Sequence, residues 1–459
     1  MKLAVRFEAG NGLHNPKMRT MCASIDSTQP ASSPNDRTMN KRKTIKWGIV
    51  SLTVVFIAYF AWDLSATSQL ESALEEARAQ GVPLTMADLI EGRPEGGNAA
   101  SHMYSEAISM CNAAGDVSEL TNEYEPFGDE GKDKQFAEVP AELLAALPDF
   151  AEGIALLHRA GEMGECYFPI EAQESLDDRI NNWDAIRTLD LSRLLVAAVK
   201  VHMDEGNLEG AKIAVQANLA LTTAHRHEPT LPVQMAGIIT ANYGARSAMI
   251  LAAQLDQPAE WLASLDLIEG TEPGSSTSLI ARALASELPY FTQALGGGED
   301  MTTKQLIELF DASDMELPDT WSLATETPYM RSAQASLIEY VAASIAIAEG
   351  PLHDAIGQAD ALANKVQEEG NSLVRAYAIN ASPLLQNYAA CLAQTRLLLL
   401  GTKAYAHRAK TGSWPKDLES LGLEELHDPR TNIPFQLIQS GSTLTLVGDG
   451  RDSVEWVLD

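Results

Sequence analysis

Residues 202–221, HMDEGNLEGAKIAVQANLAL, interrupt a long helix-prone part of the chain at one glycine, Gly206. Apolar residues on both sides recur at helical spacing, which predicts two helices joined by a tight turn. Glycine is the residue that most easily adopts the left-handed backbone that ends a helix. Leu208 and the small Ala211 follow at offsets 2 and 5, so the second helix is expected to pack closely against the first. The stretch therefore predicts a helical hairpin.

A second stretch, residues 344–362 (SIAIAEGPLHDAIGQADAL), repeats these offsets with Gly350, Leu352 and Ala355. Small residues where two helices cross are typical of tetratricopeptide-type (TPR) repeats. The two copies are not in tandem and the rest of the repeat signature is missing, so ordinary helical hairpins are the alternative. The expected fold is mainly α, an irregular helical-hairpin (TPR-like) array.

Residues 41–66, KRKTIKWGIVSLTVVFIAYFAWDLSA, predict one transmembrane helix that contacts the membrane through residues 45–63. No charged residue occurs from Trp47 to Trp62. Counted from Ile45, with the charged end of Lys46 reaching back to the interface, the stretch rises about 27 Å at 1.5 Å per residue, enough to cross a bilayer core. Basic residues precede it and acidic residues follow, so the positive-inside rule places the N-terminus in the cytoplasm and the body outside. A cleaved signal peptide is the alternative, but no small-x-small cleavage site is apparent, which favours an uncleaved signal anchor.

Charge is unevenly spread along the 459 residues. Residues 1–46 hold nine Lys/Arg and three Asp/Glu, a balance of +6, so the rest carries −36 of a chain total of −30. A body this acidic repels phosphate backbones, which excludes nucleic acid as an expected partner.

Composition and patterning divide the chain into five segments. They are a disordered cytoplasmic tail (1–40), the transmembrane anchor (41–65), a membrane-proximal helix with loops (66–139), a helical domain (140–383), and a long helix with a small antiparallel sheet (384–459). Met39 directly precedes the basic cluster and is a candidate alternative start. Helix breaks are expected at Pro229, at 269–276, at 296–300, at 316–319, and at Gly370 and Pro383.

The C-terminal segment reads as a helix followed by strands. Gly412 is expected to end the long helix, and Pro415 could not continue it. Residues 435–458 predict a strand, a turn at Ser440–Gly441, a second strand, a loop and a third strand.

This segment resembles the globular end of type II secretion major pseudopilins. The residues that carry the resemblance are Gly412, Trp414, Pro415, Leu418, Leu421, Asp428, Pro429, Pro434, Phe435, Gly448, Asp449 and Asp452. The resemblance implies a long helix packed on a small antiparallel sheet, with a Trp–Pro unit at the start of the linker. It also implies an Asp-containing loop that binds calcium.

The rest of the chain resembles a group of uncharacterised, membrane-anchored bacterial proteins. These combine hairpins like EGNLEGA (205–211), a following segment like EPTLPVQMAGI (228–238), and the same tail. Unlike a pseudopilin, this chain has its anchor about 340 residues upstream of the tail and no processed leader ahead of the anchor. The tail is therefore interpreted as a borrowed structural module.

Three aspartates are the candidate metal ligands. Asp428, Asp449 and Asp452 would supply carboxylate oxygens to a calcium ion, as the resemblance suggests, and carbonyls and water would complete the shell. The alternative is that the short loop GDGRD (448–452) only forms a tight turn.

Other clusters give no catalytic or cofactor-binding residue. His225, His227 and Glu228 form the densest potential metal cluster, but an i, i+2 spacing points the two imidazoles apart. His102 and Glu106 lie one turn apart, as in any surface helix pair. The glycine run at 296–300 lacks the lysine of a phosphate loop, and no zinc-protease or serine-hydrolase motif occurs.

Cysteine usage is compatible with an exported body. Cys111, Cys166 and Cys391 permit one disulfide and one remaining thiol, and the sequence does not choose the pair. Buried apolar cysteine is the default interpretation for each.

Together these features favour a membrane-anchored extracytoplasmic helical scaffold, or protein-interaction protein, of the bacterial envelope. An envelope hydrolase using scattered carboxylates is the alternative, because such residues leave no linear motif. An accessory component of a secretion or pilus apparatus is a third hypothesis.

Overall fold

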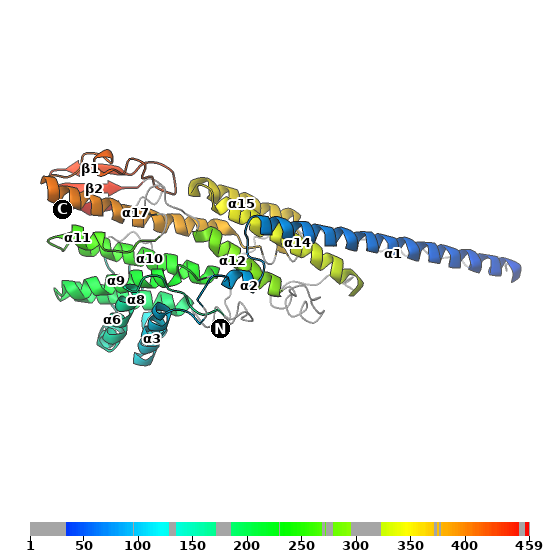
Figure 1. Ribbon diagram of the computed structural model, residues 1–459, viewed down its shortest axis with the longest axis horizontal. Helices are drawn as coiled ribbons and strands as arrows, with labels where there is room; N and C mark the ends of the chain where they lie inside the picture. Colours follow the sequence, from blue (N-terminus) through cyan, green and yellow to red (C-terminus); the bar gives the residue numbers. More distant parts are fainter. Residues whose placement is uncertain are drawn as a thin grey trace, which may run out of the picture. The chain divides into compact units, whose positions relative to one another are not determined.

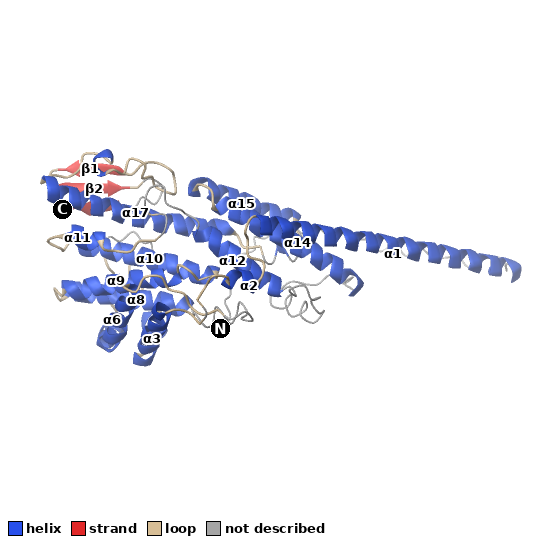
Figure 2. Cartoon of the chain, in the orientation of Figure 1, coloured by secondary structure: helices blue, strands red, loops and turns tan. Residues whose placement is uncertain are grey.

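The computed structural model describes residues 34–94, 96–127, 135–170, 185–228, 230–268, 271, 279–294, 323–370, 374–375, 378–448 and 455–458. The chain divides into two units, residues 1–60 and 61–459, and each is described by itself. The described chain is mainly helical, with a three-stranded antiparallel sheet near the C-terminus (Figure 2). This confirms the predicted fold class at the level of helices and sheet.

The longer helices and the three strands define the architecture. They are α1 (Pro34–Ala79), α3 (Ala99–Ala114), α6 (Ala151–Gly161), α8 (Ala185–Asp204), α9 (Leu208–His225), α10 (Leu231–Ala252), α12 (Leu279–Ala294), α14 (Leu323–Ala348), α15 (Leu352–Glu369), α17 (Ala381–Thr411), β1 (Gln436–Ser440), β2 (Thr443–Val447) and β3 (Glu455–Leu458). Shorter helical turns are α2 (Met86–Ile90), α4 (Val117–Thr121), α5 (Ala141–Ala146), η1 (Leu147–Phe150), α11 (Pro258–Ala263) and η2 (Glu419–Leu421).

The first helix contains the predicted anchor. Among the described helices, α1 alone is long and apolar enough to cross a membrane, over Val50–Ala79. It begins at Pro34, and the part of the predicted disordered tail before that residue lies outside the described residues. From residue 66 onward α1 turns one face inward, with Ala66, Ala73 and Ala77 buried.

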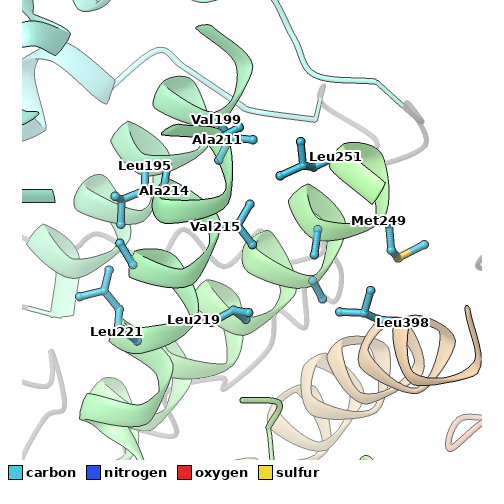
Figure 3. Packing of buried hydrophobic residues seen from close by; sticks show 14 of the residues in the cluster. Leu195, Val199, Ala211, Ala214, Val215, Leu219, Leu221, Met249, Leu251 and Leu398 are labelled. Carbon is cyan, nitrogen blue, oxygen red and sulfur yellow. The ribbon is translucent and has the colours of Figure 1, made fainter. Parts of the chain in front are cut away.

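The first predicted hairpin is formed by α8 and α9, which pack against each other. Gly206 adopts a left-handed backbone with φ 71°, and the Asn207 side chain accepts a hydrogen bond from the Gly210 amide at 3.1 Å. Ala211 is fully buried close to Val199 of α8, so the small residue lies where the two helices approach (Figure 3). The predicted hairpin is therefore present.

The second predicted hairpin is formed by α14 and α15, which also pack together. Leu352 and Ala355 are buried as expected. Gly350, however, does not have a left-handed backbone, so the two turns differ in geometry. Pro351 is instead the N-cap residue of α15, and its carbonyl accepts the amides of Asp354 and Ala355 in the first turn.

Buried apolar side chains form two cores inside residues 61–459. The first is built by α3, α6, α8, α9 and the sheet, and the second by α1, α12, α14 and α15. Helices α10 and α17, which lie side by side (Figure 1), contribute to both. On α10, Leu251 belongs to the first core and Ile238 to the second. On α17, Leu397 belongs to the first core and Leu385 to the second.

Helix α17 ends as the sequence predicts, at Gly412 in a left-handed conformation with φ 77°. Trp414 then folds back onto the module, because its Nε1 donates to the Ser442 carbonyl at 2.5 Å. The Tyr405 ring packs edge-to-face with the indole, with ring centroids 5.5 Å apart, and the Arg408 guanidinium lies 4.2 Å from the indole centroid. The Trp–Pro unit thus fixes the first hairpin of the sheet to the end of the helix.

The sheet has the order β1-β2-β3, with Leu444 and Leu446 of β2 facing α17. Trp456 of β3 packs against Gly401 of α17. The outer face carries the row Ile438, Thr445 and Val457, which are paired across the strands. The module is therefore a helix covering one face of a small antiparallel sheet.

Two sequence expectations need correction. Pro383 was expected to break a helix, but it lies in the first turn of α17, where a missing N–H is tolerated. The hairpin turn is Gly441–Ser442 rather than Ser440–Gly441, since Ser440 still pairs with Thr443. The breaks expected at Pro229, within 269–276, at 296–300 and at 316–319 lie wholly or mostly outside the described residues.

Candidate functional site

The junction between α9 and α10 contains His225 and His227, two of the three histidines that the sequence singled out. His225 is the last residue of α9 and is buried. Its Nδ1 contacts the carbonyl oxygen of Leu221 one turn earlier. Burial lowers the pKa of His225 to about 4, outweighing the contact to Leu221. The imidazole is therefore neutral at pH 7.

His227 faces a different neighbour. Its ring stacks on Tyr167 with centroids 4.5 Å apart and an interplanar angle of 18°. Burial lowers the pKa of His227, while Glu165 opposes the shift. Since His225 contacts Leu221 and His227 contacts Tyr167, the two side chains serve separate packing contacts rather than one metal ion.

Glu228 is held by an arginine from a distant segment. Its fully buried carboxylate lies 3.4 Å from Nη2 of Arg93, which follows α2. Nη1 of Arg93 also donates to the His227 carbonyl at 2.5 Å, and Nη2 donates to the Phe168 carbonyl at 3.4 Å. One guanidinium thus joins the α2–α3 loop, the segment after α6, and the α9–α10 junction.

Two further side chains close the junction from α10 and α12. Nε2 of Gln234 donates to the carbonyls of His225 and Glu228, both at 2.6 Å, and satisfies the end of α9. The buried Glu287 carboxylate accepts the Leu231 amide at the start of α10. Burial raises the pKa of Glu287 to about 7, and the Leu231 hydrogen bond offsets this in part.

A small cavity of about 10 Å³ lies beside His225. Its walls come from the end of α9, from α10, from the loop before α12 and from the first residue of α12, namely Thr222, His225, Arg226, Gln234, Gly237, Ile268 and Leu279. That volume is close to the minimum for one water molecule. The polar groups of the junction therefore tie backbone segments together, and the cavity beside them is of water size.

The predicted calcium ligands are only partly described. Asp428 is fully buried, and its carboxylate accepts Nε and Nη2 of Arg430 at 2.9 and 2.5 Å. It also accepts the Arg430 amide at 3.0 Å, which closes a tight turn. Asp449 and Asp452 lie outside the described residues. Calcium at Asp428 would have to displace a guanidinium that already occupies both carboxylate oxygens.

Within the described ranges, no three His, Cys, Asp or Glu side chains gather in a way that could hold a metal ion. His102 and Glu106 are both exposed on α3. Cys111, Cys166 and Cys391 are free and buried, as the default interpretation expected. Burial raises the pKa of Cys111 to about 11 and that of Cys391 to about 12, so both thiols stay protonated.

Sequence reasoning missed Arg93, Gln234 and Glu287. Arg93 lies 135 residues from Glu228, and Glu287 lies 56 residues from Leu231. Their partners are set by tertiary packing and leave no periodic or motif signal. The EPTLPVQMAGI segment did mark the place, because it contains both Glu228 and Gln234.

No family model matches this chain, and searches of curated proteins and of solved structures find no match either.

Proposed function

We propose that this protein is a single-pass, membrane-anchored scaffold of the bacterial envelope whose helical body binds protein partners outside the cytoplasm. The observation that carries the proposal is the run of exposed apolar side chains on α1. Trp47 and Trp62, at the two ends of the uncharged span, are 70% and 40% exposed. The large apolar side chains exposed between them are Val50, Leu52, Val54, Val55, Phe56, Ile57 and Phe60.

Energetics favour lipid as the surroundings of this run. Keeping one large apolar side chain in water rather than burying it costs about 1.5–3 kcal/mol. A continuous exposed apolar surface of this kind marks a membrane or protein contact. Indoles at both ends suit the two interfaces of a bilayer, where tryptophan is enriched.

The flanking charges support an orientation. Four basic residues lie between 41 and 46, whereas Asp63, Glu71, Glu75 and Glu76 follow the span. By the positive-inside rule the N-terminus lies in the cytoplasm and the body faces the extracytoplasmic side.

The scaffold role is supported by what the buried charges do. The Arg93–Glu228 pair connects two segments far apart in the chain, and the Arg430–Asp428 pair closes a tight turn of the C-terminal module. The two helical hairpins and the helix-on-sheet tail provide surfaces of the kind that helical repeats use to bind partners. A TPR-like stacking of the hairpins and a pseudopilin-like origin of the tail are finer parts of this proposal.

Membrane anchoring is tested by alkaline extraction of the full chain. The chain should stay with the membrane pellet, and a Val55→Arg/Ile57→Arg variant should be released, because each charge at the centre of a span costs about 2.5–3.5 kcal/mol. An Ile213→Arg variant on the exposed face of α9 is the matched control and should stay in the pellet. Release of the unaltered chain would refute the anchor.

Orientation is tested with a membrane-impermeant maleimide on intact spheroplasts. The three described thiols are buried, so Cys22 reports the N-terminal side and a Met163→Cys variant reports the body, where Met163 is 44% exposed. Residue 163 should react in intact cells and Cys22 only after permeabilisation. The reverse pattern would place the body in the cytoplasm.

Partner binding is tested by affinity capture of the full chain from detergent-solubilised membranes. Ile438 and Val457 are exposed on the outer face of the sheet, so an Ile438→Lys/Val457→Lys variant alters the tail without opening a core. An Ile213→Lys variant, on the exposed face of α9, is the matched control. A partner recovered with the parent and with this control, but lost with the tail variant, would make the tail the recognition element. Absence of any specific partner from all three samples would count against the scaffold role.

A further inference from the structure

A side chain of the body contacts α1 at the point where the predicted membrane span ends. Nη1 of Arg331 on α14 lies 2.7 Å from the Asp63 carboxylate and donates to the Thr67 hydroxyl at 3.0 Å. The Thr67 hydroxyl in turn donates to the Asp63 carbonyl at 2.8 Å. One guanidinium therefore fastens α14 to the turn of α1 that follows Trp62.

Burial along α1 changes within that same turn. Trp62 and Leu64 are exposed, whereas Ala66 is only 1% exposed. The helix thus passes from an apolar exposed surface to a face covered by the body without an intervening linker.

This short transition limits how far Arg331 can lie from a bilayer. At 1.5 Å per residue, Asp63 lies about 1.5 Å and Thr67 about 7.5 Å beyond Trp62 along the helix axis. A bilayer has a hydrocarbon core of about 30 Å inside a total of about 40–45 Å, so each headgroup layer is roughly 5–7 Å thick. If the Trp62 indole lies in one interface, the Arg331 guanidinium lies within or just above the headgroups.

The chemistry of Arg331 suits that position. Its side chain is 32% exposed while it holds Asp63. A guanidinium has five N–H donors in a planar fork and pairs well with phosphate. The body as a whole carries a large net negative charge and is repelled by anionic lipids. A cation at this place therefore supplies a local attraction to lipid phosphate that the net charge of the body does not supply.

We propose that Arg331 seats the body on the membrane, holding Asp63 and Thr67 of α1 while it binds the phosphate of a phospholipid headgroup. This inference rests on the proposed membrane anchor. It adds that the body lies directly on the bilayer at α14 rather than being held away from it.

The test measures the depth of a probe beside Arg331. The full chain with Cys22→Ser and Ser332→Cys is labelled with an environment-sensitive fluorophore and reconstituted in phosphatidylcholine vesicles, which carry no net charge. A chain with Cys22→Ser and Met163→Cys, labelled next to the first core, is the matched control. Lipids with a headgroup nitroxide should quench the probe at residue 332 several-fold more strongly than the probe at residue 163. Equal quenching at the two positions would overturn the proposal.

The role of Arg331 is tested in the same labelled chain. Arg331→Gln should lose most of the quenching difference, and Arg331→Lys should retain part of it because a cation remains. Unchanged quenching in Arg331→Gln would refute the role of the guanidinium, and near-ultraviolet circular dichroism would show that the variant is folded.

Alkaline extraction of the same vesicles separates this proposal from the anchor. The parent chain could stay in the pellet while the probe at residue 332 is quenched no more than the probe at residue 163. That result would contradict the proposed contact between Arg331 and lipid and would leave the membrane anchor intact. A parent chain released to the supernatant contradicts the anchor, and the seat with it.

Discussion

Gly401 of α17 and Trp456 of β3 touch so closely that a Cβ atom added at Gly401 would lie 1.7 Å from Cζ3 of the indole. The indole ring is rigid and 6% exposed, so it has little room to move away. The absence of a side chain at Gly401 is what allows the third strand to pack on the helix.

Gly401→Ala should therefore destabilise the protein by about 3 kcal/mol or more, at the upper end of the range for overpacked cores. Urea unfolding followed by tryptophan fluorescence measures the change. Gly357→Ala is the matched control, because Gly357 lies inside α15 with open space around it and should gain about 0.5–1 kcal/mol from helix propensity. Similar midpoints for the two variants would contradict this account of the contact.

Glu287 should give the protein a pH-dependent stability. Its folded pKa of about 7 lies above its ordinary 4.5, so the folded state holds the proton more tightly than the unfolded state. The contribution of Glu287 to the free energy of unfolding is fully present below about pH 4.5 and is lost as the pH rises through 7. This loss is on the order of 3 kcal/mol. Glu287→Gln cannot ionise, so its advantage over the parent should grow across that window.

Urea midpoints measured from pH 4 to pH 8.5 would show this difference. Glu368→Gln, at an exposed position of α15, should follow the parent at every pH. If the urea midpoints of Glu287→Gln and the parent differ by the same amount at every pH, Glu287 does not change its protonation state between pH 4 and pH 8.5, and the prediction is wrong.

The Arg93–Glu228 pair predicts a large effect from one substitution. Arg93→Met removes the cation that faces a fully buried carboxylate, which should cost about 3–5 kcal/mol. Lys212→Met breaks the exposed pair with Glu209 on α9 and should cost about 0–1 kcal/mol. Chemical denaturation of both variants measures the contrast, and equal losses would show that burial of Glu228 is not what makes the pair important.

Gly206 predicts a backbone effect with no packing component. A Cβ atom there would meet nothing within 4 Å, but φ is 71°. Gly206→Ala should cost about 1–2 kcal/mol, and Gly206→Asn should cost less because asparagine tolerates the left-handed region. Thermal unfolding of the two variants ranks them, and an alanine variant as stable as the parent would exclude strain at this turn.

Local patterns predicted the elements better than their partners. The turn at Gly206, the helix end at Gly412 and the alternation in β2 follow from short-range chemistry, so the sequence was enough to place them. The contacts of Arg93 and Glu287 join segments far apart in the chain, and nothing near either residue specifies its partner. The calcium prediction linked Asp428 to Asp449 and Asp452, but the described contact of Asp428 is with Arg430, two residues away.

The sharing of α10 and α17 between the two cores has a mechanical consequence. Each helix is continuous, so a force applied to the second core, beside the end of α1, is transmitted to the C-terminal sheet without a break in either helix. Cutting the chain before α17 would take Leu385 and Leu392 from one core and Leu397 and Leu400 from the other. The body should therefore unfold under such a force as one cooperative unit, and neither half should fold when it is produced alone.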